Sequence, residues 1–292
     1  MRRTLVRAFT VVLGGLSLVA GGATATAAVA AQDPAEGTPV DVAHRGSSGS
    51  APENTLAAVE AALAQKASFV EVDVQRSADG ELVIIHDTTL ARTTNVEEVF
   101  PDRAPWAVGS FTLAEIRRLD AGSWFAPEFA GEPVPTLREV LDTLGRRAGL
   151  LLEVKSPASY PGIEVAIDKE LSATPGYLSS ALAAGRLVVQ SFDHESMRRY
   201  HDLAPEVPIG LLYGYRPTAV EIAAAATWAQ QVNPSYRVTD QALVDQVHAH
   251  GMTISVYTLN TGALMREYAA MGVDGIITDY PVVLRDILDR RS

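Results

Sequence analysis

Beyond residue 37, short runs rich in aliphatic and β-branched residues alternate with longer stretches whose apolar residues recur at helical spacing. The nine strand-like runs are PVDVAH (39–44), FVEVDV (69–74), ELVIIH (81–86), LLLEVK (150–155), RLVVQSF (186–192), PIGLLYG (208–214), QVNPS (231–235), MTISVYTL (252–259) and DGIITD (274–279). The eight helical stretches are 53–67, 136–148, 161–173, 194–203, 217–230, 239–250, 262–271 and 281–290. Alternation of this kind predicts a parallel sheet whose strands are connected by helices.

One of the nine runs cannot be part of a parallel barrel. FVEVDV and ELVIIH are separated only by QRSADG, whose Asp-Gly pair is a turn signal. Because parallel neighbours need a crossover of about a dozen residues or more, these two runs form an antiparallel hairpin. We therefore predict an α/β fold, an eight-stranded (β/α) TIM barrel with a β-hairpin arm after strand 2. If Arg76 pairs with Glu81 across the turn, Glu71 lies opposite His86.

The segment 88–135 does not fit the alternation. It is rich in Pro, Gly, Trp and Phe and contains at most one short helix, near 112–119. A loop of this length is uncommon inside a compact domain unless it has a function. We predict an insertion that forms a small cap beside one end of the barrel. Because α/β barrels of this size often fold undivided, we predict a single domain over 38–292.

The first 31 residues have the composition of a cleavable export signal. Arg2, Arg3 and Arg7 precede an apolar run over 8–20, and small residues with A-x-A sites follow it. The apolar run is too short to span a bilayer comfortably. We predict a signal peptide over 1–31, a protein secreted by the Sec or the twin-arginine route, and no stable membrane insertion after cleavage. The alternative is a retained membrane anchor.

Charge and cysteine content restrict the partners. The formal net charge is −11, and it becomes −14 when the three arginines of the signal are removed. Since the phosphates of nucleic acids require a positive surface, we predict no nucleic-acid partner. The chain has no cysteine, so an exported form has no disulfide bonds. A domain of about 260 residues buries enough surface to fold without them. The oligomeric state stays open.

Polar residues gather at the ends of the predicted strands, where the active sites of (β/α) barrels lie. They are His44, Arg45, Glu71, Asp73, His86, Glu153, Lys155, Gln190 and Asp279. Crowded carboxylates repel one another, and a hard divalent cation with oxygen ligands, Mg²⁺ or Ca²⁺, removes that cost. Two histidines can exchange protons near neutral pH, while arginine and lysine can bind a phosphate. These groups together predict a metal-assisted phosphodiester hydrolase.

Motifs along the whole mature chain resemble the glycerophosphodiester phosphodiesterase family. They are HRG…PENT, EVDVQRSADGELVIIHD, LLEVKSP…YPGIE, VVQSF and GVDGIITDYP. The resemblance implies a barrel with one bound divalent cation, Mg²⁺ or Ca²⁺. It also implies a small-molecule substrate, a glycerophosphodiester, which is cleaved to glycerol 3-phosphate and an alcohol.

The family's functional residues fall on particular positions of this chain. The metal ligands fall on Glu71, Asp73 and Glu153. The general acid and base fall on His44 and His86. The resemblance therefore assigns one metal centre and one pair of proton carriers to the predicted barrel face.

Further positions match the family's phosphate-binding and supporting residues. Arg45 and Lys155 match the phosphate-binding positions, and Glu53 and Asn54 match a segment that braces the first loop near the metal. One position departs from the family pattern. Near the seventh barrel strand the family usually has Trp-Thr-x-Asn, and this chain has Tyr257 in place of the tryptophan. The departure leaves open how the glycerol or the alcohol is held.

The mechanism, implied in part by the resemblance, has two stages. One histidine takes the proton of the glycerol 2-hydroxyl, which attacks phosphorus, and the other protonates the departing alcohol. Water then opens the cyclic phosphate with the roles reversed. The sequence does not decide which histidine is the acid or which alcohol departs. The alternatives are a lipid phosphodiesterase of the sphingomyelinase D or lysophospholipase D type, a glycoside hydrolase using Glu71 and Glu153, and a non-catalytic phosphodiester-binding barrel.

Overall fold

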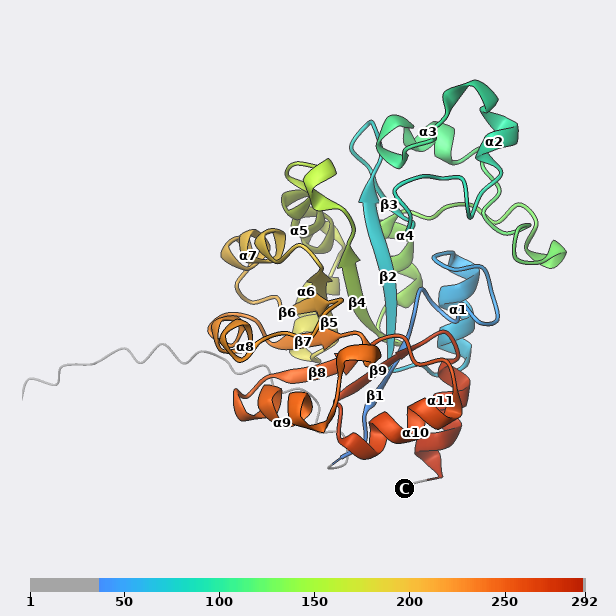
Figure 1. Ribbon diagram of the computed structural model, residues 1–292. Helices are drawn as coiled ribbons and strands as arrows, with labels where there is room; N and C mark the ends of the chain where they lie inside the picture. Colours follow the sequence, from blue (N-terminus) through green and yellow to red (C-terminus); the bar gives the residue numbers. More distant parts are fainter. Residues whose placement is uncertain (1–36, 291–292) are drawn as a thin grey trace, which may run out of the picture.

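A computed structural model describes residues 37–290, which form a barrel surrounded by helices (Figure 1). The predicted signal peptide, residues 1–31, lies outside the described residues, as do residues 291–292. The strands within 37–290 are β1 Val40–Ala43, β2 Phe69–Arg76, β3 Leu82–Ile84, β4 Gly149–Val154, β5 Leu187–Ser191, β6 Ile209–Tyr213, β7 Gln231–Pro234, β8 Thr253–Val256 and β9 Gly275–Thr278. Eight of them pair in parallel in the order β1-β2-β4-β5-β6-β7-β8-β9, and β9 pairs with β1 to close the barrel. The predicted eight-stranded barrel is confirmed.

Helices cover the outside of the barrel. They are α1 Leu56–Ala64, α4 Leu137–Leu144, α5 Ile163–Ala173, α6 Tyr177–Ala183, α7 His194–Leu203, α8 Ala219–Ala225, α9 Gln241–Ala249, α10 Gly262–Met271 and α11 Pro281–Asp289. Six begin after a Thr or Asp whose side chain accepts a backbone N–H of the first turn, which stabilises a helix start. The sequence did not predict α6. None of the helices within 37–290 is long and apolar enough to cross a bilayer.

The inner face of the barrel changes from apolar to polar toward the C-terminal ends of the strands. A small apolar layer inside the barrel consists of Val42, Leu151, Val188 and Ile277. Side chains two positions apart lie on the same face of a strand, so the residues two positions after these four also point into the barrel. They are His44, Glu153, Gln190 and Asp279. The apolar layer therefore forms the floor beneath a polar cavity.

Strand β2 is longer than its neighbours and extends beyond the barrel. Its first residues pair in parallel with β1, and its last three pair antiparallel with β3. This arrangement confirms the predicted hairpin arm, which Figure 1 shows rising from the barrel.

The predicted hairpin register is wrong by one residue. Arg76 pairs with Leu82 rather than with Glu81. The strands are connected by residues 77–81 rather than by 77–80, because Glu81 pairs with Ser77 instead of with Arg76. The Ser77 N–H donates to the carbonyl of Glu81 at 2.9 Å, and the Ser77 hydroxyl accepts the Glu81 N–H at 2.9 Å. As a consequence Glu71 does not lie opposite His86, which follows the end of β3.

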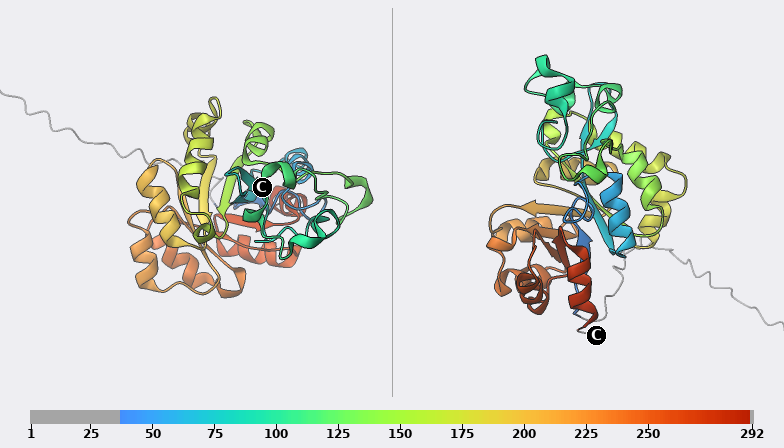
Figure 2. Two further views of the ribbon diagram at one scale, coloured as in Figure 1. Left: turned by 90° about the horizontal axis from the view of Figure 1, so that it is seen from above. Right: turned by 90° about the vertical axis from the view of Figure 1, so that its right-hand side faces the viewer.

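The segment between β3 and α4 forms the predicted insertion and has more helical structure than expected. It contains α2 Val96–Val99, α3 Leu113–Ile116 and three 3₁₀ turns at Pro101–Arg103, Val108–Ser110 and Pro127–Phe129. Elements of three or four residues are too short for apolar periodicity to reveal them. Phe111, Ile116 and Leu90 pack in an apolar core of the insertion that is separate from the main core. Figures 1 and 2 show the insertion beyond the C-terminal end of β2.

Candidate active site

Three acids converge inside the barrel. Glu71 and Asp73 of β2 are each 1% exposed, and Glu153 of β4 is 8% exposed. Asp73 is paired in register with Glu153 on the neighbouring strand, and Glu71 lies two residues before Asp73 on the same face. One carboxylate oxygen from each of the three lies within 4.8 Å of the others. We call Glu71, Asp73 and Glu153 the carboxylate cluster.

The carboxylate cluster has the properties of a cation site. Oε1 of Glu71 and Oδ1 of Asp73 are buried and have no hydrogen-bond partner among residues 37–290. Burial and the neighbouring carboxylates raise the pKa of Glu71 well above its usual value, and burial and Asp73 raise that of Glu153 to about 7. Unsatisfied buried charge is costly unless a partner is present. Three oxygen donors at this spacing fit a hard divalent cation.

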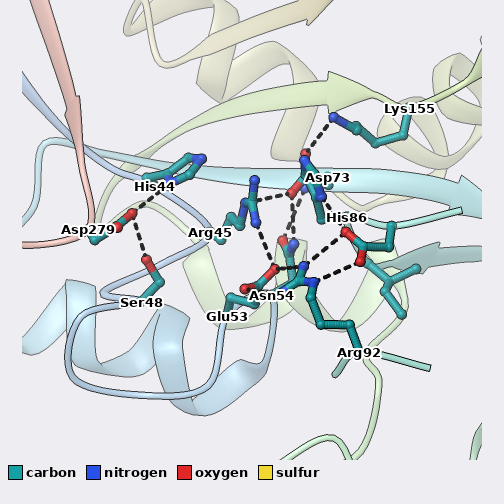
Figure 3. Close-up of polar contacts among 12 residues, drawn as sticks. His44, Arg45, Ser48, Glu53, Asn54, Asp73, His86, Arg92, Lys155 and Asp279 are labelled. Carbon is teal, nitrogen blue, oxygen red and sulfur yellow. Dashed lines mark hydrogen bonds and ion pairs between the residues drawn. The ribbon is translucent and has the colours of Figure 1, made fainter. Parts of the chain in front are cut away.

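Asp73 differs from the other two acids because two cationic side chains lie near it, whereas Glu153 pairs with Lys155 alone, at 2.6 Å. Arg45 Nε lies 3.3 Å and Lys155 Nζ 3.7 Å from its carboxylate, and Asn54 Nδ2 donates to it at 2.8 Å (Figure 3). Burial acts to raise the pKa of Asp73, but Arg45, Lys155, His86 and Asn54 outweigh it and leave the pKa below its usual value. Asp73 is therefore the only acid of the carboxylate cluster whose pKa is lowered rather than raised.

The loop between β1 and α1 turns sharply to place two of these groups. Arg45 and Asn54 have φ angles of 56° and 59°, in the left-handed region that non-glycine residues seldom adopt. The Arg45 N–H donates to Glu71 Oε2 at 2.8 Å, and the Asn54 N–H donates to the Arg45 carbonyl at 3.0 Å. The Asp73 N–H in turn donates to Asn54 Oδ1 at 3.1 Å. Unusual backbone held by such contacts is common at functional sites.

Each of the two predicted catalytic histidines is hydrogen bonded through Nδ1 to an aspartate. His44 Nδ1 donates to Asp279 Oδ1 at 2.6 Å, and His86 Nδ1 donates to Asp87 Oδ1 at 2.7 Å. Burial lowers the pKa of His86. A ring that is held through Nδ1 keeps Nε2 for proton exchange.

Sequence reasoning missed the two aspartates as partners of the histidines. Asp279 was noted only as an acid at a strand end, and Asp87 was not singled out. The available signals were the position of Asp87 directly after His86 and the position of Asp279 just beyond the last strand. Burial acts to raise the pKa of Asp279, but hydrogen bonds from His44, Ser48 and Asn260 outweigh it and lower the pKa.

Both histidines and two acids of the carboxylate cluster, Glu71 and Glu153, line one cavity of about 210 Å³, and Asp73 lies next to them without lining it. The lining of the cavity comprises His44, Arg45, Glu71, His86, Glu153, Lys155, Gln190, Phe192, Leu212, Tyr257, Thr258 and Ile277. The buried Gln190 accepts a hydrogen bond from Asn233 at 2.8 Å. The predicted residues Glu53 and Asn54 do not line the cavity. Glu53 forms an ion pair with Arg45, and Asn54 donates a hydrogen bond to Asp73.

Aromatic rings form one wall of the cavity. The Tyr257 ring packs edge to face against Phe192 with centroids 5.9 Å apart, and the Tyr257 hydroxyl donates to the Tyr213 carbonyl at 2.9 Å. Lys155 Nζ lies 5.8 Å from the centre of the Phe192 ring. Phe192 is 49% exposed and was not predicted as a site residue, although it ends the RLVVQSF run. Tyr257 thus retains an aromatic surface where the family pattern has tryptophan.

These features define a class of protein, the (β/α)-barrel hydrolases of phosphate diesters. A metal-compatible carboxylate cluster, two cationic side chains and two proton-carrying rings at one site suit that reaction. The family model described as "Glycerophosphoryl diester phosphodiesterase family" matches residues 44–283. The chain belongs to this family.

Relatives support the assignment over most of the chain. A glycerophosphodiester phosphodiesterase of Bacillus subtilis is 38% identical over 252 residues, covering 82% of this chain and 83% of the relative. One from Caldanaerobacter subterraneus subsp. tengcongensis is 38% identical over 249 residues, covering 85% and 96%. Among solved structures, an Oleispira antarctica phosphodiesterase in complex with the product sn-glycerol-3-phosphate superposes with a TM-score of 0.77 at 30% identity, covering 86% of this chain and 97% of that one.

Proposed function

We propose that this chain is a secreted, metal-dependent glycerophosphodiester phosphodiesterase that releases glycerol 3-phosphate and an alcohol. The observation that carries the proposal is that both histidines line one cavity together with Glu71 and Glu153, two acids of the carboxylate cluster. The complex of the Oleispira antarctica relative with sn-glycerol-3-phosphate supports the same product here.

The side chains of the cavity suit a two-stage hydrolysis through a cyclic phosphate. A divalent cation, Mg²⁺ or Ca²⁺, held by the carboxylate cluster would supply a Lewis acid for the phosphate. Arg45 and Lys155 bind the phosphate oxygens and offset their charge. One imidazole Nε2 accepts the proton of the glycerol 2-hydroxyl, and the other donates a proton to the departing alcohol oxygen. In the second stage water opens the cyclic ester and the two rings exchange roles.

The aspartates that flank the site support the proton transfers. Asp279 and Asp87 each hold one ring through Nδ1, so that both tautomer and orientation are set before substrate arrives. A ring that gains a proton during turnover is stabilised by the adjacent carboxylate. Gln190 and Tyr257 are the supporting residues that shape the wall around the substrate.

The size of the cavity favours a small, water-soluble substrate. Its volume of about 210 Å³ lies below the roughly 300–1,000 Å³ of sites that enclose larger organic ligands. A deacylated glycerophosphodiester suits it better than a phospholipid with acyl chains, which places the lipid phosphodiesterase second. Secretion is supported by the composition of residues 1–31. N-terminal sequencing of protein from the culture medium tests it, and a chain that retains residues 1–31 in the membrane would contradict it.

The test of the function is hydrolysis of a panel of glycerophosphodiesters by the mature protein, with release of glycerol 3-phosphate as the readout. We expect turnover with Mg²⁺ or Ca²⁺, none in EDTA, and none with lysophosphatidylcholine. H44A and H86A should each lose about 10²–10⁴-fold in kcat because each removes a proton carrier. A matched control is H248A, since His248 also pairs with an aspartate, Asp274, at 2.8 Å but lies in α9 on the surface.

Three results would contradict the proposal. Release of glycerol 3-phosphate that persists in EDTA would show that the phosphodiester hydrolysis needs no metal. Full activity in both H44A and H86A would remove the acid and base roles. Binding of glycerophosphodiesters without turnover would favour the non-catalytic barrel.

A further inference from the structure

Arg92, an arginine of the insertion, lies between two carboxylates at the edge of the site (Figure 3). Its Nε and Nη2 donate to the two oxygens of Asp87 at 2.7 and 3.0 Å. Its Nη1 and Nη2 donate to the two oxygens of Glu53 at 2.8 Å each. One guanidinium therefore holds both oxygens of two separate carboxylates, a geometry that a planar five-donor group can make and an ammonium cannot.

Both carboxylates also hold a residue that lines the cavity. Asp87 Oδ1 accepts the Nδ1 hydrogen of His86 at 2.7 Å. Glu53 Oε1 accepts from Arg45 Nη1 at 2.8 Å. A continuous chain of hydrogen bonds thus runs from one proton carrier through Arg92 to one phosphate-binding residue. Arg92 itself is not part of the cavity lining.

We propose that Arg92 is a positioning residue, which sets His86 through Asp87 and Arg45 through Glu53 and thereby makes the insertion part of the catalytic apparatus. This inference rests on the proposed function.

The torsion of a terminal carboxylate is broad, so a carboxylate with one partner has no fixed orientation. Arg92 removes this freedom from both acids. A displacement of about 1 Å in a catalytic group can cost about 10²-fold in rate.

The insertion holds Arg92 in place. Leu90 and Val96, on either side of it, are both fully buried in the core of the insertion. The Leu90 N–H donates to the Trp106 carbonyl at 2.9 Å, and the Leu90 carbonyl accepts the hydroxyl of Thr94 at 2.6 Å. Arg92 thus projects from a packed segment, which lets the insertion act on the cavity without contacting substrate.

A purely structural role would give a different outcome. Ion pairs of partly exposed side chains contribute little to stability. If Arg92 served only to dock the insertion, R92Q would lower Tm slightly and leave kcat unchanged. Kinetics and thermal unfolding measured on the same protein therefore separate the two roles.

The experiment compares R92Q, R92K and the control R199Q in the mature protein, with glycerophosphocholine as substrate. Arg199 of α7 also donates two hydrogen bonds to a buried acid, Glu164, at 2.7 and 3.0 Å, and neither residue lines the cavity. We expect R92Q to lose about 10–100-fold in kcat/KM, as for other residues that orient site groups. The loss should remain at saturating substrate. R92K should recover part of it, and R199Q should stay within twofold of wild type.

A double-mutant cycle locates the effect. Because one of the two routes by which Arg92 acts runs through Asp87 to His86, R92Q should cost less in a D87N background than in the wild type, while the route through Glu53 to Arg45 is retained. Equal losses in the two backgrounds would overturn the inference, as would an R92Q enzyme with kcat and KM within twofold of wild type.

A readout without turnover separates this inference from the proposed function. Imidazole ¹⁵N NMR of the resting protein should show altered His86 resonances in R92Q and unaltered His248 resonances. Unchanged His86 resonances overturn the positioning role. Absence of hydrolysis by the wild type overturns the proposed function instead.

Discussion

At the scale of single residues, the acids of the carboxylate cluster differ in the partners that offset their negative charge. Glu71 accepts one backbone N–H from Arg45, and its second oxygen has no partner within residues 37–290. Asp73 is held by Arg45, Lys155 and Asn54. Without a metal, the charge of Glu71 opposes folding, whereas the charge of Asp73 favours it.

This difference predicts opposite stability effects for two isosteric substitutions. The pKa of Glu71 is raised on folding, so its ionisation destabilises the fold as pH rises; the pKa of Asp73 is lowered, so its ionisation stabilises the fold above its unfolded pKa. In EDTA at pH 8, E71Q should therefore raise Tm and D73N should lower it, although both variants should lose activity. Thermal unfolding of both proteins checks this, and a fall in Tm for E71Q would contradict it.

Single residues could be assigned to the site where their spacing along the sequence places them on one face of a strand. Contacts between residues far apart in the sequence could not be predicted. Two-residue spacing predicted that Glu71 and Asp73 share a face, but it left open whether that face is buried. The pairing of His44 with Asp279 joins residues 235 positions apart, and only the closure of the barrel brings them together. The bridge between Arg92 and Glu53 joins residues 39 positions apart and has no local signature for the same reason.

At the scale of elements, the β1–α1 loop can pack beside α1 because residue 46 is a glycine. Gly46 has a φ of +80°, its N–H donates to the Glu71 carbonyl at 3.1 Å, and a Cβ there would lie 2.5 Å from the backbone of Ala58. This close approach lets α1 pack beside the turn that carries His44 and Arg45. The loop has little freedom to accept a larger residue.

We expect G46A to lose both stability and most activity, because the backbone clash displaces the turn. The matched control is G80A at the tip of the hairpin, where φ is +96° and nothing lies within 4 Å of the added Cβ. G80A should cost only the left-handed conformation itself, about 1–2 kcal/mol, and should retain activity. Chemical denaturation and kcat/KM check both. Equal effects of the two substitutions would show that the contact with Ala58 is unimportant.

Strands and long helices were predictable from periodicity, and shorter features were not. Every barrel strand overlaps its predicted run. Helix α6 was missed because it is seven residues long and follows Pro175 and Gly176, which signal a break. The predicted hairpin register was wrong because Ser77 hydrogen bonds to Glu81, which shifts the pairing of the strands by one residue. The Asp-Gly turn signal does not contain this information.

At the scale of the whole molecule, barrel closure turns dispersed sequence motifs into one cavity. The motifs span residues 44 to 279 and meet because parallel strands end at the same face. Alternation and the hairpin signal were enough to predict this architecture. The insertion's own core was not predictable, since its short turns depend on packing against Val83 and Ile85 of the hairpin arm.

Titration calorimetry of the metal-free protein with Mg²⁺ or Ca²⁺ tests the central claim, a cation held by the carboxylate cluster, most directly. Because the pKa values of Glu71 and Glu153 are raised, the latter to about 7, bound protons must leave when a cation binds. We predict one cation per chain, proton release on binding, weaker binding at pH 5.5 than at pH 8, and loss of binding in D73N. Undiminished binding in D73N, or no binding by a wild-type protein that still hydrolyses glycerophosphodiesters, would contradict the account.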